Sequence, residues 1–323
     1  MSATDPKITR RVAIAGTAAM GAMLTAPVQA AAPLLGAHSA IFNRFTLGDF
    51  EITTIADGFV SVPTVHPFFG SNVAKEEVDA LAGENLLPSD GIKLGFTPTL
   101  VNTGKELVLF DAGNGDVRRP NAGLLRDRLA VAGYTPEQVD VIAITHMHPD
   151  HIGGLMEDGE PAFPNARYVA STTEYNFWTN TDLASNEQVS GIHALVMERV
   201  APLAEKMTFI DDEQDVVSGI TAVAANGHTP GHTLFRIDNG GKSVLLTADT
   251  ANHFVFSLQR PDWHFQFDFD PGKAAATRRR VFDMLATDEM AFIGYHMPFP
   301  SLGYVQASGN GFRYTPHSYQ LEL

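Results

Sequence analysis

The sequence predicts a single α+β domain built from two similar halves. Both halves contain strand-like segments that end in histidine or aspartate, helix-like segments lie among them, and no linker separates the halves. The chain has 323 residues, of which 44% are hydrophobic and 18% are charged, so it can form a sizeable core. These observations favour one globular domain over residues 32–323.

Residues 1–31 are expected to lie outside this domain. They contain the pair Arg10-Arg11, a weakly apolar run of Ala, Gly and Met, and an A-x-A-like end at Ala30. This order is typical of a bacterial Tat export signal, and the apolar run is too short to span a bilayer. The sequence therefore predicts a periplasmic or secreted protein. The alternative is a disordered tail in which two arginines are adjacent by chance.

The first half begins with strand-like segments. Residues 45–59 alternate between apolar and polar side chains and are rich in Thr, Ile and Phe. Residues 97–113 form a second strand-like segment, with a hairpin turn at 102–104. Residues 120–134 then place Leu124, Leu125, Leu129 and Val131 on one helix face, with Gly133 as the stop. Residues 139–146 are nearly all apolar, which is typical of a strand buried on both faces.

The second half follows the same pattern. Residues 219–228 and 242–250 are predicted strands that end at His228 and Asp249, and residues 290–298 are a last strand that ends at His296. Residues 275–286 are a predicted helix. Between the halves, residues 171–206 have a helical pattern, and we expect them to cover the site as an insertion.

Histidines are concentrated in the stretch THMHPDHIGG, residues 145–154. It places His146, His148, Asp150 and His151 on the loop that leaves a buried strand, where binding groups commonly lie. Later strand ends add His228, Asp249 and His296. Seven nitrogen and oxygen ligands suit zinc, manganese, cobalt or iron, and they exceed what one tetrahedral ion needs. The sequence therefore predicts two divalent metal ions that share a carboxylate, most simply two zinc ions.

Composition excludes several functional classes. The formal net charge of −15 and the lack of a basic run argue against nucleic acid or an anionic membrane as partner. No segment approaches the roughly 20 apolar residues of a membrane-spanning helix. The chain has no cysteine, so a thiolate ligand and a cysteine nucleophile are both excluded. A small-molecule substrate remains as the expected partner.

The motifs HMHPDH, GHTPGH, LTAD and GYHMP together resemble the metallo-β-lactamase superfamily over residues 45–323. The resemblance implies a four-layer αβ/βα sandwich with a dinuclear metal site at the sheet edge. It implies that one ion binds His146, His148 and His228, that the other binds Asp150, His151 and His296, and that Asp249 bridges both. It also implies that Asp111 orients a ligand histidine and that His232 is structural or lies just behind the ligands.

Within that superfamily the chain looks like the methyl parathion hydrolase and lactonase branch. The likeness lies in HMPFPSLGYVQASGNGFRYTP, LGDFEITTIADGFVSVP and AFPNA. It implies a homodimeric hydrolase of lactones, aryl esters or phosphotriesters. Two departures concern the pocket. The loop NGDVRRPNAG lacks the aromatic residue of the organophosphate-cleaving enzymes, and Asn252 stands where acyl-homoserine lactonases carry a tyrosine.

These likenesses predict a metal-dependent hydrolase of lactones or aryl esters that also accepts organophosphate triesters. Asp150 and Asp249 are its expected catalytic carboxylates. The alternatives are a dedicated organophosphate hydrolase and, without catalysis, a periplasmic metal- or ligand-binding protein. The predicted substrate pocket consists of His66, Trp178, Asn252, His253 and Phe256. Trp263 and Phe265 either join Phe256 in an aromatic wall or belong to the core.

Overall fold

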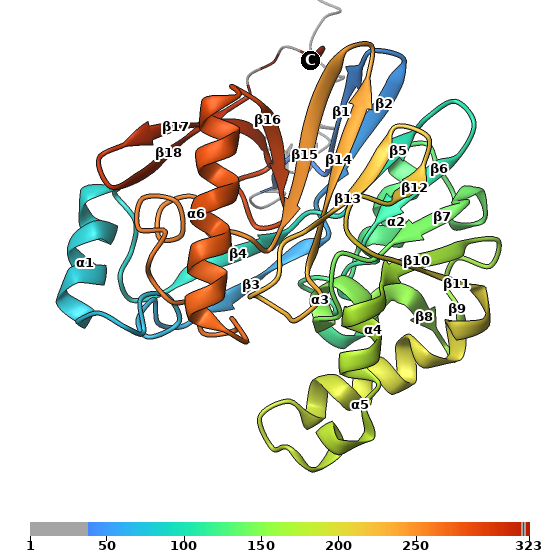
Figure 1. Ribbon diagram of the computed structural model, residues 1–323, viewed down its shortest axis with the longest axis horizontal. Coiled ribbons are helices and arrows are strands. Elements are labelled where there is room, and N and C mark those ends of the chain that lie inside the picture. Colours follow the sequence, from blue (N-terminus) through green and yellow to red (C-terminus); the bar gives the residue numbers. More distant parts are fainter. Residues whose placement is uncertain (1–37, 318, 320) are drawn as a thin grey trace, which may run out of the picture. The chain divides into compact units, whose positions relative to one another are not determined.

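Two seven-stranded sheets pack face to face in the computed structural model, which describes residues 38–317, 319 and 321–323 (Figure 1). The first sheet has the order β1-β2-β5-β6-β7-β10-β11. Its strands are β1 (Phe42–Leu47), β2 (Phe50–Ile55), β5 (Thr99–Asn102), β6 (Leu107–Phe110), β7 (Val141–Ala143), β10 (Arg167–Ser171) and β11 (Met207–Ile210). Strands β6, β7, β10 and β11 are parallel, so their carboxyl ends meet at one edge.

The second sheet contains the last seven strands in chain order. They are β12 (Asp215–Val217), β13 (Ile220–Ala224), β14 (Thr233–Asn239), β15 (Lys242–Ala248), β16 (Ala291–Gly294), β17 (Leu302–Ser308) and β18 (Gly311–Pro316). Only β15 and β16 pair in parallel. The predicted strands of this half, including the one that ends near His296, are confirmed.

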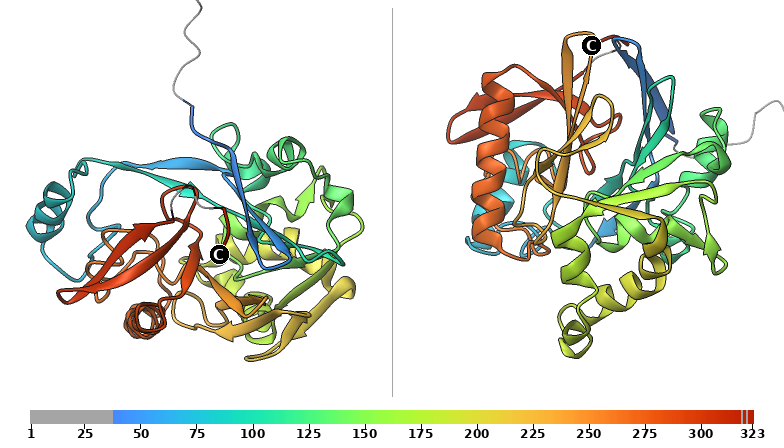
Figure 2. Two further views of the ribbon diagram at one scale, coloured as in Figure 1. Left: turned by 90° about the horizontal axis from the view of Figure 1, so that it is seen from above. Right: turned by 45° about the vertical axis from the view of Figure 1, so that its right-hand side comes forward.

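Three hydrophobic clusters hold four layers together. Between the sheets, Val108 and Phe110 of the first pack with Phe235 and Ile237 of the second. Helices α2 (Leu125–Val131), α4 (Thr172–Trp178) and α5 (Ser190–Arg199) cover the outer face of the first sheet, and α6 (Pro271–Thr287) covers that of the second (Figures 1 and 2). The predicted four-layer αβ/βα sandwich is confirmed.

Helix α6 shows how its sequence fixes one outer layer. It begins at Asp270, whose carboxylate accepts a hydrogen bond from the backbone N–H of Lys273 at 3.0 Å, and Pro271 occupies the first turn. Its face toward the sheet carries Val281, Phe282 and Leu285, each at most 1% exposed. These side chains pack with those of β14, β15 and β16.

Helix α2 ends as the sequence predicts but packs through fewer residues. Gly133 follows it with φ +92°, a conformation that favours glycine. Leu125 and Leu129 are buried, whereas Val131 is 60% exposed. The prediction for Val131 is therefore wrong, because the helix is short and this residue lies on its last turn, facing away from the sheet.

A smaller assembly stands beside the sandwich. It comprises the two-stranded sheet β3 (Gly58–Val62) and β4 (Ile92–Phe96), helix α1 (Lys75–Glu84) and the loop 250–269. A separate hydrophobic cluster holds these segments together, and it includes Val62, Phe69, Leu81, Phe256, Trp263 and Phe265. The periodicity of the sequence did not predict α1 or β4 as separate elements.

The remaining elements are short. They are α3 (Pro149–Ile152), the strands β8 (Met156–Glu157) and β9 (Glu160–Pro161), and the 3-10 turns η1 (Gly115–Arg118), η2 (Pro136–Gln138), η3 (Gly153–Leu155), η4 (Thr181–Ser185) and η5 (Ala201–Lys206). The segment 171–206 is helical, as predicted. In the part of the chain that the structure describes, no helix has the length and apolar character needed to cross a membrane. The predicted export signal over residues 1–31 lies outside the described residues.

Candidate metal centre

All seven predicted ligands lie on loops that leave strands at one edge of the two sheets. The loop after β7 carries His146 and His148 and continues into α3, which carries Asp150 and His151. The second sheet contributes the other three, which follow β13, β15 and β16: His228, Asp249 and His296. Residues separated by up to 150 positions therefore converge because both sheets end their strands at the same edge.

The ligands form two groups. The first group is His146, His148 and His228, and the second is Asp150, His151, Asp249 and His296. Within each group the ligand atoms lie within 4.8 Å of one another. Each group alone has enough donors for one ion, and the division is the one that the family resemblance implies, with Asp249 counted in the second group.

Asp249 lies between the two groups. Its Oδ2 atom is 3.4 Å from Nε2 of His228 in the first group and 3.1 Å from Nε2 of His296 in the second. Its Oδ1 atom is 3.3 Å from Nε2 of His151. One carboxylate oxygen thus faces both groups, which is the position that a bridging ligand needs.

The polar atoms of this cluster fit bound cations better than they fit one another. Nδ1 of His148 lies 3.1 Å from Nε2 of His146 and 2.9 Å from Nε2 of His228, so three ring nitrogens converge. Burial and the neighbouring His228 lower the pKa of His148 to about 3, which favours the neutral, metal-binding form. Nε2 of His151 and Oδ1 of Asp249 are buried and have no hydrogen-bond partner among the described residues. The cluster fits a dinuclear divalent metal site.

Three hydrogen bonds orient the ligand histidines from behind. Nδ1 of His151 donates to Asp111 at 2.7 Å, Nδ1 of His228 donates to Asp268 at 2.9 Å, and Nδ1 of His296 donates to the carbonyl oxygen of Gly95 at 2.8 Å. Each bond fixes the ring so that Nε2 faces the centre. Asp111 adopts φ +62°, an uncommon conformation for a residue other than glycine, at the end of β6.

His232 lies next to the first group and is fully buried. Its Nδ1 donates to the carbonyl oxygen of Ala225 at 3.1 Å, and its Nε2 accepts a hydrogen bond from the backbone N–H of Asp249 at 3.1 Å. Burial lowers its pKa to about 3, so it is neutral and supports the Asp249 backbone. This placement matches the supporting position that the sequence predicts for it.

Sequence reasoning missed Glu174, a buried carboxylate on α4. One oxygen accepts hydrogen bonds from the backbone N–H of Met147 at 2.9 Å and from the indole N–H of Trp178 at 2.8 Å. The other accepts from the hydroxyl of Thr229 and the backbone N–H of Gly231, both at 2.8 Å. Glu174 therefore joins the loop of His146 and His148 to the loop of His228. A glutamate on a helix that is otherwise half-buried gives no local signal of this role.

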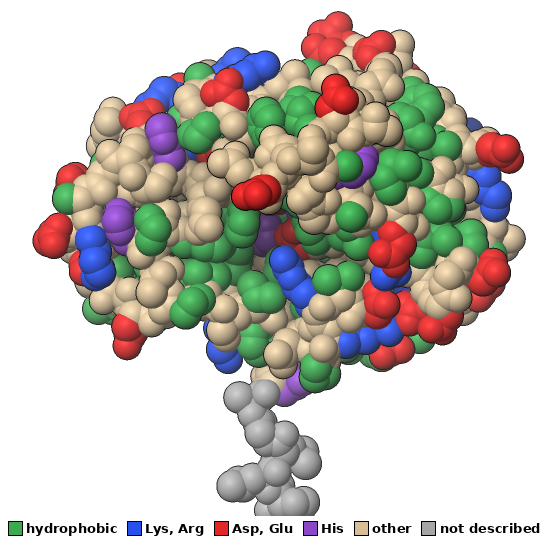
Figure 3. All heavy atoms as spheres, turned by 90° about the horizontal axis from the view of Figure 1, so that it is seen from below, with side chains coloured by type: hydrophobic (Ala, Val, Ile, Leu, Met, Phe, Trp, Pro, Cys, Tyr) green, Lys and Arg blue, Asp and Glu red, His purple; other side chains and the backbone are tan. Residues whose placement is uncertain are grey.

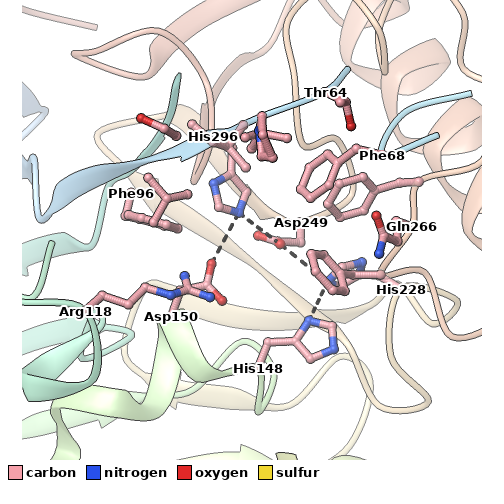
Figure 4. A pocket seen from close by; sticks show the side chains of 17 residues that line it. Thr64, Phe68, Phe96, Arg118, His148, Asp150, His228, Asp249, Gln266 and His296 are labelled. Atoms are coloured by element: carbon pink, nitrogen blue, oxygen red, sulfur yellow. Dashed lines mark hydrogen bonds and ion pairs between the residues drawn. The ribbon is translucent and has the colours of Figure 1, made fainter. Parts of the chain in front are cut away.

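A cavity of about 350 Å³ opens onto the ligands. Figure 3 shows a hollow on this face, with histidine and acidic side chains at its base, hydrophobic side chains around it and a basic side chain beside it. Figure 4 shows how the lining side chains surround Asp249 and His296. The wall consists of Val60, Ser61, Val62, Pro63, Thr64, Phe68, Leu94, Phe96, Arg118, Phe265, Gln266 and Phe267. Most of these residues come from β3, β4 and the loop 250–269.

The five residues predicted to form the substrate pocket lie elsewhere, so that prediction is corrected. Trp178 packs behind His148, because Glu174 binds its indole N–H. Asn252 is buried and donates to Asp249 at 2.9 Å. Phe256 belongs to the hydrophobic cluster of the small assembly, and the ring of His253 packs against it with centroids 4.6 Å apart. His66 does not line the cavity and hydrogen-bonds the carbonyl oxygen of Val73 at 3.2 Å.

Of the remaining aromatic candidates, Phe265 lines the cavity and Trp263 does not. Arg118, which sequence reasoning also missed, lies on the wall beside Asp150 (Figure 4). Burial and the neighbouring Asp249 raise the pKa of Asp150, but the neighbouring His151, His296 and Arg118 outweigh this effect and lower it. Arg118 could have been noticed in the sequence, because it is a basic residue on the loop that follows the carboxyl end of a predicted strand.

The profile of the metallo-beta-lactamase superfamily matches residues 97–296, which contain all seven ligands. The chain belongs to the metallo-β-lactamase superfamily. Curated relatives in this superfamily include an N-acyl homoserine lactonase of Bacillus thuringiensis, 26% identical over 166 residues. The match covers 50% of this chain and 58% of that protein. The lactonase AttM of Agrobacterium fabrum is 28% identical over 133 residues, 39% of this chain and 46% of that protein.

Two solved structures share nearly the whole metallo-β-lactamase fold of this chain. One is AidC, described as a dizinc quorum-quenching lactonase, with a TM-score of 0.81 and 29% identity over 86% of this chain and 98% of AidC. The other is the hydrolase AbOPH, with a TM-score of 0.81 and 27% identity over 88% of this chain and 99% of AbOPH. The lactonases of B. thuringiensis and A. fabrum, in contrast, match over less than two thirds of their own length.

Proposed function

We propose that this protein is a dizinc hydrolase that opens lactones and cleaves aryl esters. The observation that carries the proposal is the pair of ligand groups that share Asp249 at the base of a cavity with apolar walls. Nitrogen and oxygen ligands without sulfur suit zinc. The likeness to AidC and to several N-acyl homoserine lactonases supports both the metal and the reaction class.

The residues of the site divide the work of such a reaction. Two bound zinc ions would supply Lewis acidity and a water of lowered pKa. Asp150 retains 13% side-chain exposure toward the cavity, so its carboxylate can accept the proton of the attacking water as the new C–O bond forms. It then returns this proton to the leaving oxygen as the ester C–O bond breaks. The product is a hydroxy acid or, from an aryl ester, an acid and a phenol.

The backbone of Asp150 is fixed for this role. The hydroxyl of Tyr295 donates to its carbonyl oxygen at 2.6 Å, and the Tyr295 ring stacks on His151 with centroids 3.9 Å apart. Asp249 keeps its two oxygens between the ligand groups, and Asn252 donates to it from behind. These contacts keep both carboxylates at the base of the cavity before a substrate binds.

The test measures hydrolysis of dihydrocoumarin, phenyl acetate and a dimethyl aryl phosphotriester by protein of determined metal content. We expect kcat/KM to be highest for the lactone or the ester. His146→Ala should abolish turnover and remove one of two equivalents of zinc. His317→Ala, at a half-buried histidine after β18, is the matched control and should keep both. Absence of turnover with two equivalents bound would favour a binding protein and overturn the proposal.

Phosphotriester hydrolysis is a second candidate activity. Four phenylalanines line the cavity, Phe68, Phe96, Phe265 and Phe267, and they offer apolar surface to an aryl leaving group. The same comparison of substrates decides its importance. A phosphotriester preference of more than about tenfold, or about 1.4 kcal/mol of transition-state stabilisation, would make it the principal activity.

Export and assembly as a homodimer remain proposals that rest on the sequence. N-terminal sequencing of the protein recovered from a periplasmic fraction tests the first, and a new terminus near Ala30 or Ala31 is expected. Light scattering of the purified protein tests the second. A protein retained at full length in the cytoplasm, or a monomer in solution, would contradict the respective proposal.

A further inference from the structure

Arg118 provides the positive charge on the cavity wall. Among the described residues that line the cavity, it is the single Lys or Arg, and the other polar wall residues are Ser61, Thr64 and Gln266. No carboxylate of the described residues lies within 4.0 Å of its guanidinium. A guanidinium has five N–H donors in a planar array that matches a carboxylate. Arg118 therefore has donors available for a ligand in the cavity.

The Arg118 side chain is held in place by contacts on two sides. Its Nη1 donates to Oδ1 of Asn114 at 3.0 Å, and its guanidinium lies over the Phe96 ring, 5.3 Å from the centroid. Both contacts restrict a long side chain that would otherwise lose rotamer freedom when it binds a ligand.

Asn114 is in turn fixed by a buried carboxylate. Oδ2 of Asp57 accepts from the side-chain amide of Asn114 at 2.7 Å and from its backbone N–H at 2.9 Å. The same carboxylate accepts from the backbone N–H groups of Gly123 and Leu125. One buried aspartate thus anchors both ends of the loop that carries Arg118.

We infer that Arg118 determines specificity and that it selects substrates with a carboxylate on the carbon that bears the scissile ester oxygen. This inference rests on the proposed function, because it names the substrate class of that same site. Arg118 lies beside Asp150 on the wall (Figure 4), so a group bound to its guanidinium would lie near the ester bond on which Asp150 acts. The carboxylates Asp150 and Asp249 face the histidine ligands, which leaves the guanidinium for the substrate.

The experiment compares two lactones that differ in one charge. The first is a γ-butyrolactone with a carboxylate on the ring carbon next to the ring oxygen, and the second is its neutral carboxamide. In the wild-type zinc enzyme we expect kcat/KM to be about 10- to 100-fold higher for the carboxylate, the range of a hydrogen bond to a charged group. Arg118→Met should reduce this ratio to about 1, and Arg118→Lys should give an intermediate value.

Arg126→Met is the matched control. Arg126 lies on α2, pairs with Glu157 at 3.8 Å and does not line the cavity, so the variant removes the same charge without touching the wall. Its ratio should equal that of the wild type. A wild-type ratio near 1, or an unchanged ratio in Arg118→Met, would overturn the inference.

A binding measurement separates failure of the inference from failure of the proposed function. Calorimetry of the two ring-opened hydroxy acids gives a ratio of dissociation constants that needs no turnover. If neither lactone is hydrolysed but this ratio depends on Arg118, the proposed function fails and the charge selection stands. If both lactones are hydrolysed and neither ratio depends on Arg118, the inference fails and the proposed function stands.

Discussion

Glu174 illustrates how one buried residue can determine metal affinity without contacting the metal. Its two oxygens accept four hydrogen bonds, three from the loops that carry His146, His148 and His228 and one from the indole N–H of Trp178 on the same helix. In Glu174→Gln one oxygen becomes an NH₂ group that faces two donors, so those bonds are lost. We expect zinc affinity of the first ligand group to fall by about 10- to 100-fold, while the second group keeps its zinc.

Zinc titration with a competing chromophoric chelator measures this effect. Glu205→Gln, at an exposed glutamate of η5, is the control and should bind two zinc ions like the wild type. Equal affinity of Glu174→Gln for both ions would show that the four bonds do not hold the first group together.

His253 should make stability depend on pH. Burial lowers its pKa to about 3, from about 6.5 in an unfolded chain, and its ring packs against Phe69 and Phe256. The unfolded chain binds a proton at this histidine at a higher pH than the folded protein does. The free energy of unfolding is therefore highest above pH 6.5 and decreases as the pH falls below it. Between pH 7 and pH 5 this loss is about 2 kcal/mol for one such histidine.

Urea unfolding of His253→Gln and the wild type at several pH values checks this expectation. Glutamine has no group that titrates between pH 5 and pH 7. The difference between the two proteins should therefore change by about 2 kcal/mol between pH 7 and pH 5. His264→Gln, at a half-buried histidine of the same loop, is the control, and parallel curves for all three proteins would contradict the assignment.

The sequence predicted the ligands well and the pocket poorly, for a physical reason. His146, His148, Asp150 and His151 are adjacent in the chain, and the strand ends that carry the others are legible as apolar runs. The wall residues instead depend on how β3, β4 and the loop 250–269 pack, which is a long-range property. Trp178 and His253 have the residue types of a pocket, but their partners Glu174 and Phe256 place them in the interior.

At the scale of elements, the loop after β6 and the turn η3 approach backbone to backbone. A Cβ atom added at Gly154 would overlap the carbonyl oxygen of Ala112, and one at Gly153 would overlap that of Asn114. The backbone N–H of Gly154 also donates to the carbonyl oxygen of Gly113 at 3.1 Å. The two glycines after His151 therefore allow the loop of Arg118 to lie against α3.

Gly154→Ala should force these two segments apart. We expect the free energy of unfolding to fall by about 1–3 kcal/mol, the usual effect of an added methyl group in a filled space. Gly83→Ala is the control, because nothing lies within 4 Å of a Cβ at this helical position in α1, and it should stabilise by about 0.5–1 kcal/mol. Denaturant unfolding measures both, and equal stability of the two variants would contradict the close approach.

Helices and strands were easier to predict where a short stretch of sequence defines them. The buried strand β7 and the strands β15 and β16 follow directly from the apolar runs in the sequence. Helix α1 was missed because it buries only Val78, Leu81 and Ala82, so its apolar face is narrow. Its packing partners include Trp263, far along the chain, and no local pattern indicates them.

At the scale of the whole molecule, the metal ligands join the two sheets. The first sheet supplies His146 and His148, and the second supplies His228, Asp249 and His296. Ions that bind only the folded state should stabilise it by about 4 kcal/mol when free metal exceeds the dissociation constant a thousandfold. We therefore expect a chelator to lower the Tm in calorimetry and added zinc to restore it.

Magnesium is the control, because it prefers oxygen ligands and should not restore the Tm. A Tm that is unchanged after complete removal of the metal would show that the two sheets dock without the help of the ligand cluster.

The walls of the cavity and its base are stabilised by different parts of the interior. The ligand loops extend from the two large sheets, whereas most of the wall belongs to the small assembly of β3, β4 and the loop 250–269, with its own hydrophobic cluster. Substitutions in that assembly can reshape the space around a substrate while the chemistry at the base is inherited unchanged. Homologues that keep the ligand loops can therefore change their substrate range through substitutions in residues 58–96 alone. A mutant library confined to these residues would vary the substrate range in the same way.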